Sequence, residues 1–168
     1  MAKKRDTGKN FESEIRRSLK SSKHIWWFRI QDTNDINRFV KQAVAEKQPA
    51  DFFTVYRGRP IMLEAKTSRN LTSFPLHYGS SRAIPKHQVS YGEGLVRAGG
   101  IALILIRREE YRNKKCYAIT PSQAKYLYSK AFKRKSAKWE WFEEHAYKVD
   151  RLKAPLRWNL HKLYEEII

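Results

Sequence analysis

The run at residues 101–106 constrains the fold more than any other stretch of this 168-residue chain. It is apolar at every position, and Gly99 and Gly100 precede it. A strand that is apolar on both of its faces is typical of the centre of a sheet that is covered on both sides. The run is also far too short to cross a bilayer. The chain is therefore expected to pack helices around a central sheet.

The remaining periodicities predict the elements around that strand. Phe11, Ile15 and Leu19 recur every four residues, which predicts a helix with Asn10 as its N-cap, after a flexible basic arm over residues 1–9. Strands are expected over residues 25–31, 51–57, 61–67 and 117–119. Helices are expected to begin at Pro85 and at Thr120-Pro121, with a long loop over residues 68–83 and one or two further helices after Lys133.

This order predicts an α/β fold with a central mixed β-sheet flanked by helices. A single domain is expected over residues 10–168. Within it, the polar segment 33–47 is interpreted as a protruding arm, and residues 121–168 as a C-terminal helical extension.

The charge of the chain points to a polyanionic partner. Lys and Arg number 35 against 17 Asp and Glu, which gives a net charge of +18. Nucleic acid is the default partner, because neutralised phosphates release counterions and so favour binding. A membrane surface would call for one basic amphipathic helix, whereas these basic residues run through the whole chain. The single cysteine and the lack of an apolar run after the basic N-terminus predict no signal peptide and an intracellular, cytoplasmic location.

Two carboxylates and a lysine are expected to converge at one end of a hairpin. Alternation along residues 61–66 places Glu64 and Lys66 on the same face, roughly 6–7 Å apart along the strand. Asp51 begins the preceding strand, and a turn near Gly58 and Pro60 brings it beside Glu64. The alternative is that Glu-x-Lys is an ordinary charge pattern on a solvated strand, since short motifs are often found by chance.

Such a pair of carboxylates suits a hard divalent cation. Two carboxylates at one point repel each other unless a cation lies between them. Mg²⁺ prefers oxygen ligands and retains several waters, so it could contact a phosphate and activate a water for in-line attack. The ammonium of Lys66 could orient that water or stabilise charge on the phosphorus. These residues together predict phosphodiester hydrolysis with Mg²⁺ or Mn²⁺.

At this point the sequence resembles a known group of enzymes. Pro49-x-Asp51 followed by Glu64-x-Lys66 is similar to the PD-(D/E)XK nucleases. Residues 58–76, GRPIMLEAKTSRNLTSFPL, resemble RecU-type Holliday junction resolvases, and Gly8-x-x-Phe11-Glu12 resembles the start of both RecU-type and archaeal resolvases. His87-Gln88 and Gly99-Gly100 are similar too, so the resemblance covers residues 8–120.

The resemblance implies a restriction-endonuclease-like core and roles for particular residues. Asp51 and Glu64 would be metal ligands, Lys66 the catalytic lysine, Glu12 a further metal ligand and Gln88 a supporting polar residue. Periodicity alone favours an ordinary pair between Glu12 and Arg16, four residues along the helix. The resemblance also implies a homodimer that resolves four-way DNA junctions by paired symmetric nicks, and a stalk at residues 33–47.

Several basic residues are candidate DNA contacts, although an exposed arginine on an edge strand, such as Arg29, is also an ordinary feature. The candidates are Arg29, Arg38, Lys41, Arg69, Arg82 and Lys86. Three functions stay open on the sequence: a junction resolvase, a restriction-like or nicking endonuclease on duplex DNA, and a non-enzymatic nucleic-acid-binding module. Only the first two require a divalent metal and the carboxylates.

Overall fold

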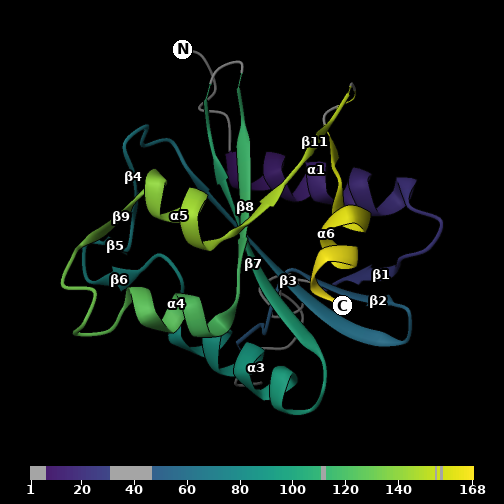
Figure 1. The fold of residues 1–168 in the computed structure, drawn as a ribbon, viewed down its shortest axis with the longest axis horizontal. Coiled ribbons are helices and arrows are strands. Elements are labelled where there is room, and N and C mark those ends of the chain that lie inside the picture. Colours follow the sequence, from purple (N-terminus) through teal and green to yellow (C-terminus); the bar gives the residue numbers. More distant parts are fainter. Residues whose placement is uncertain (1–6, 31–46, 111–112, 154, 156) are drawn as a thin grey trace, which may run out of the picture.

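The computed structural model describes residues 7–30, 47–110, 113–153, 155 and 157–168. A six-stranded mixed sheet lies at its centre, in the order β1-β2-β3-β7-β8-β10 (Figure 1). Its strands are β1 (Trp26–Arg29), β2 (Phe52–Tyr56), β3 (Arg59–Ser68), β7 (Ile101–Arg108), β8 (Lys115–Ile119) and β10 (Tyr147–Val149). The central pair β3 and β7 is parallel, and the other neighbours are antiparallel. The predicted α/β fold with a mixed sheet is confirmed.

Helices cover both faces of this sheet, as the apolar run in β7 predicted. The helices are α1 (Thr7–Ser21), α3 (Lys86–Arg97), α4 (Pro121–Leu127), α5 (Trp139–His145) and α6 (Leu160–Ile167). Side chains of α1 and α6 pack with Leu63 and Leu105 on one face. Side chains of α3, α4 and α5 pack with Ile104 and Ile106 on the other.

The hairpin of β2 and β3 forms where the sequence predicted it. Arg57 and Gly58 make its turn, and both have positive φ angles, of 49° and 76°. Two such residues give the turn a twist that matches the twist of the strands. Pro60, expected in the turn, instead lies within β3 opposite Val55.

Two predicted boundaries are corrected. Helix α1 begins at Thr7, three residues before the expected N-cap Asn10, so residues 7–9 do not belong to a flexible arm. The guanidinium of Arg107 donates a hydrogen bond of 3.1 Å to the Thr7 carbonyl, and this tertiary contact extends the first turn. Helix α3 begins at Lys86 with Pro85 as its N-cap, one residue later than predicted.

The expected loop over residues 68–83 contains three short strands. They are β4 (Ser73–Pro75), β5 (His77–Tyr78) and β6 (Ser81–Arg82). Strands β5 and β6 form a hairpin, whereas β4 pairs with β9 (Ser136–Lys138) from far along the chain. A partner so distant in sequence leaves no local periodic signal, which explains why this segment reads as a loop.

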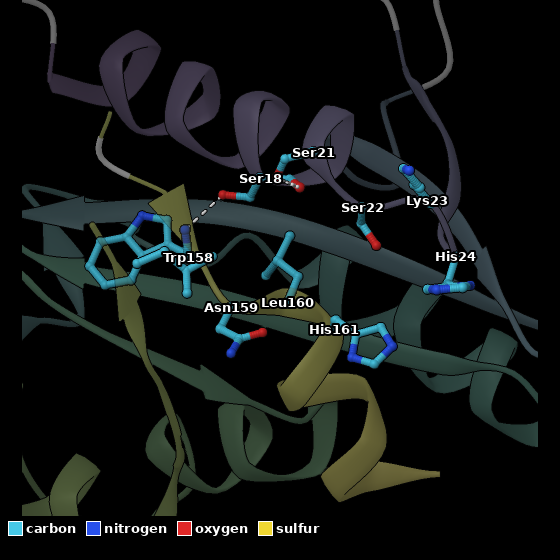
Figure 2. A pocket seen from close by; sticks show the side chains of 10 residues that line it. Ser18, Ser21, Ser22, Lys23, His24, Trp158, Asn159, Leu160 and His161 are labelled. Atoms are coloured by element: carbon cyan, nitrogen blue, oxygen red, sulfur yellow. Dashed lines mark hydrogen bonds between the residues drawn. The ribbon is translucent and has the colours of Figure 1, made fainter. Parts of the chain in front are cut away.

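The C-terminal part, residues 121–168, contains the expected helices α4, α5 and α6, and also strands that the sequence did not predict. It supplies the sixth strand of the main sheet, β10, together with β9, β11 (Arg151–Leu152) and β12 (Arg157–Trp158). Figure 2 shows the backbone N–H of Trp158 donating to the Ser18 hydroxyl, at 2.7 Å. The Trp158 indole also donates to Glu14 at 3.2 Å. These contacts join this segment to α1 and make it part of the core on that face of the sheet.

Candidate active site

The start of β2 lies beside the middle of β3, and this places the predicted acidic residues together. Phe52 pairs with Leu63, so Asp51 precedes the ladder next to Glu64. The Ala65 N–H donates to Asp51 Oδ2 at 2.8 Å, which fixes the carboxylate against β3. Glu64 is 5% exposed and thus almost fully buried. The predicted convergence of Asp51 and Glu64 is confirmed by this geometry.

Lys66 lies beside Glu64 on the same face of β3. Its Nζ lies 2.7 Å from Glu64 Oε1, and its side chain is 21% exposed. The ammonium is therefore held at the mouth of the site while it remains open to solvent. A charge-assisted contact of this length fixes the lysine more firmly than a neutral hydrogen bond would.

Burial raises the pKa values of both carboxyl groups, and repulsion from neighbouring carboxylates adds to this effect. The pKa of Asp51 rises from 3.8 to about 7, first because of burial and then because of the Glu64 carboxylate. Burial also raises the pKa of Glu64, against the lowering effects of Lys66 and Gln88. Strongly shifted pKa values on paired buried acids are typical of functional sites.

The residues fit a divalent cation. Glu64 Oε2 is buried and has no hydrogen-bond partner within the described residues. A buried carboxylate oxygen without a partner is costly, and a cation next to Asp51 would satisfy it and offset the repulsion by Glu64 that raises the pKa of Asp51. Among the described residues, no group of three or more His, Cys, Asp and Glu side chains is arranged to hold a metal; the carboxylates brought together here are those of Asp51 and Glu64.

Glu12 and Gln88 approach the site from two different helices. Glu12 pairs with Arg29 at 2.6 Å, not with Arg16, and its charge still contributes to raising the pKa values of Asp51 and Glu64. Gln88 lies in the first turn of α3 and lowers the pKa of Glu64 through a side-chain hydrogen bond. Its Oε1 is buried without a partner among the described residues. Glu12 as a metal ligand stays a prediction.

The predicted DNA contacts lie in different places. Arg29 is engaged by Glu12, Arg69 is exposed in the loop after β3, and Lys86 is exposed in the first turn of α3. Arg82 lies in β6 with its guanidinium 4.4 Å from the Tyr128 ring centroid. Arg38 and Lys41, with nearly all of the predicted stalk at residues 33–47, lie outside the described residues.

One residue near the site was not singled out as functional from the sequence. His87 is close enough to the ammonium groups of Lys47 and Lys66 for them to lower its pKa, after the larger effect of burial. The signal was available, because a helix that begins after Pro85 places His87 beside Gln88 in its first turn.

A second hollow lies on the opposite face of the sheet, between the end of α1 and the start of α6 (Figure 2). Its lining includes Ser21, Ser22, His24 and His161, and no Asp or Glu is among the described residues that line it. It therefore lacks carboxylates of the kind that Asp51 and Glu64 bring together beside Lys66.

Comparison with known proteins now identifies the family. The model of the family described as RecU, Recombination protein U, matches residues 8–163. The chain belongs to the RecU family. The match includes most of the C-terminal part, so the family resemblance extends well beyond the expected limit at residue 120.

Named relatives are similar over a shorter stretch. The Holliday junction resolvase RecU of Geobacillus sp. is 39% identical over 69 residues, which are 41% of this chain and 30% of that protein. The protein of the same name from Shouchella clausii is 41% identical over 69 residues, 41% of this chain and 29% of that protein. The matched stretch is thus less than a third of the length of these relatives. Hjc, a Holliday junction resolvase from Archaeoglobus fulgidus, aligns over 78% of this chain and 86% of its own, with 14% identity and a TM-score of 0.45.

No helix within the described residues is long and apolar enough to cross a membrane.

Proposed function

We propose that this RecU-family protein is a metal-dependent endonuclease that resolves Holliday junctions by paired symmetric nicks. The observation that carries the proposal is the pair of neighbouring carboxylates, the partly buried Asp51 and the buried Glu64, held beside the partly exposed ammonium of Lys66. The net charge of +18 supports a DNA substrate, and the relatives bear the name Holliday junction resolvase. Such a protein acts where the DNA is, in the cytoplasm.

Asp51 and Glu64 would hold Mg²⁺ or Mn²⁺, with Glu12 as a further contributor. When bound, the cation supplies Lewis acidity toward a phosphate oxygen and lowers the pKa of a bound water. Glu12 reaches the site from α1, and its contact with Arg29 at 2.6 Å fixes the position of its carboxylate.

The other side chains have roles that follow from their positions. The ammonium of Lys66, fixed by Glu64, orients the attacking water and stabilises negative charge on the phosphorus in the transition state. Gln88 keeps the Glu64 carboxylate in place, and its unpartnered Oε1 accepts a hydrogen bond from a water in the site. Backbone phosphates would be bound by the basic residues around the site, including Arg69, Arg82 and Lys86.

Paired nicks require two sites, so we propose that two copies assemble about a two-fold axis. Strand β1 is the edge of the sheet and carries Trp26 and Phe28, which are 60% and 46% exposed. Their ring centroids lie 5.9 Å apart, which makes one apolar surface of the kind that a second copy covers. Sedimentation equilibrium on the wild type and on Trp26→Ser should give a dimer and a weakened dimer.

A cleavage assay tests the function directly. A labelled four-way junction and a linear duplex of matching sequence are incubated with Mg²⁺, with EDTA, and with Asp51→Asn protein. Paired nicks in the junction alone, lost in EDTA and in the variant, are the expected result. Cleavage of both substrates would indicate a restriction-like nuclease, and tight binding without cleavage under any divalent metal would leave a non-enzymatic DNA-binding module.

A further inference from the structure

A basic groove opens next to the active site, between the β5–β6 hairpin and the first turn of α3. Its lining includes Lys47, His77, Arg82, Lys86 and His87. No Asp or Glu is among the described residues that line it. Figure 1 shows the two short strands beside β9 and α4, on the far side of the molecule from α6. Cations without a neighbouring carboxylate attract phosphate groups.

Tyr128 holds the hairpin side of this groove in place. Its hydroxyl donates to the Leu76 carbonyl at 2.8 Å and accepts from the Ile84 N–H at 3.0 Å, so it ties the two ends of the hairpin together. The guanidinium of Arg82 lies 4.4 Å from the centroid of the same ring. The His77 ring meets it edge-on, with centroids 5.5 Å apart. Side chains fixed in this way lose little entropy on binding a ligand.

The groove is continuous with the active site through one turn of helix. Lys86 and His87 line the groove, whereas the next residue, Gln88, contacts Glu64. Burial and the ammonium groups of Lys47 and Lys66 lower the pKa of His87, so its imidazole is neutral at pH 7. It can donate or accept a hydrogen bond there without adding charge.

We propose that this groove binds the backbone of the strand that is cut, at the phosphates next to the scissile one. Arg82 and Lys86 contact the phosphates, and Tyr128 is a positioning residue for Arg82. The assignment rests on the proposed nuclease function, because it places the scissile phosphate at Asp51 and Glu64. The DNA strand that is cut would therefore run from the active site along α3 and past the β5–β6 hairpin.

The first test measures junction binding in EDTA by fluorescence anisotropy over a series of salt concentrations. Arg82→Gln and Lys86→Gln should each lower the slope of log Kd against log salt by about 1, the value expected for one lost phosphate contact. Lys20→Gln removes the same charge from the exposed last turn of α1 and should leave the slope unchanged. Equal effects of all three variants would overturn the proposal, because they would indicate a general charge effect.

The second test identifies which DNA strand lies in the groove. Single methylphosphonates, which lack the phosphate charge, are placed along the cut strand and along an uncut strand. Substitution next to the scissile position should weaken binding by the wild type but not by the Arg82→Gln/Lys86→Gln double variant. The proposal fails if the sensitive positions lie on the uncut strand or are the same for both proteins.

Tyr128→Phe tests the positioning role. It keeps the ring under Arg82 but removes the two hydrogen bonds of the hydroxyl, so Kd should rise about fivefold while the salt slope stays that of the wild type. An unchanged Kd would refute the role. Cleavage by the wild type with Mg²⁺ is measured separately, so a failure of the groove assignment is distinguishable from a failure of the nuclease function.

Discussion

Replacing Asp51 with Asn should stabilise the metal-free protein at alkaline pH while it abolishes cleavage. The pKa of Asp51 rises from 3.8 to about 7 on folding, because burial and the Glu64 carboxylate oppose its ionisation. An acid whose pKa is raised in the folded state binds its proton more tightly there. The free energy of unfolding therefore falls as the pH rises from about 4 to about 7. Asn carries no charge, and it keeps an oxygen that can accept the Ala65 N–H.

The size of the effect follows from the two pKa values. Between pH 5 and pH 8, ionisation of Asp51 should destabilise the wild type by about 3 kcal/mol relative to the variant. For a chain of this size that corresponds to a Tm difference of about 6 to 12 °C. Urea unfolding in EDTA at the two pH values measures it. The matched control is Asp150→Asn, which removes an exposed carboxylate paired with Lys162.

Metal should reverse the order of stability. At pH 8, Mg²⁺ binds the folded wild type and should raise its Tm, whereas Asp51→Asn should respond weakly or not at all. The reasoning is refuted if the difference in stability between the two proteins does not grow with pH, or if Asp150→Asn reproduces it. Below pH 7 the affinity of the wild type for Mg²⁺ should fall about tenfold per pH unit, because Asp51 must lose its proton to act as a ligand.

Three further predictions concern cleavage and stability. Lys66→Ala should abolish cleavage. Junction binding in EDTA, measured by gel-shift titration, should stay within about threefold of the wild type, because only one solvent-accessible cation is lost. A large loss of binding would contradict a catalytic role. Arg107→Ala should lower the free energy of unfolding by about 3–5 kcal/mol, since this arginine is fully buried against Glu14 and Glu109; Lys125→Ala, in an exposed pair, should cost under about 1 kcal/mol by the same urea titration. Gly92→Ala should lower the free energy of unfolding by about 1–3 kcal/mol and reduce kcat. The added Cβ would lie 2.7 Å from Pro121 Cγ and would push α3, which carries Gln88, away from the sheet. An unchanged kcat at saturating metal would show that α3 tolerates the shift.

The sequence by itself determined the central strands and the placement of Asp51 beside Glu64. Alternation in residues 61–66 and a hairpin turn at Gly58 are local signals, and together they set the register that brings Asp51 beside Glu64. The apolar run of β7 predicted a covered central strand for a similar reason. Where neighbouring residues alone decide the geometry, the pattern in the sequence is sufficient to predict it.

Only the tertiary structure decided the features that depend on distant residues. The pairing of β4 with β9, the sixth strand β10 and the early start of α1 at Thr7 each depend on contacts made far along the chain. The choice of Arg29 over Arg16 as the partner of Glu12 is of the same kind. Hydrophobic burial is non-directional, so periodicity shows that a face is covered without showing by which segment. The basic groove also depends on distant residues. Its hairpin is held by Tyr128, which lies more than 40 residues further along the chain.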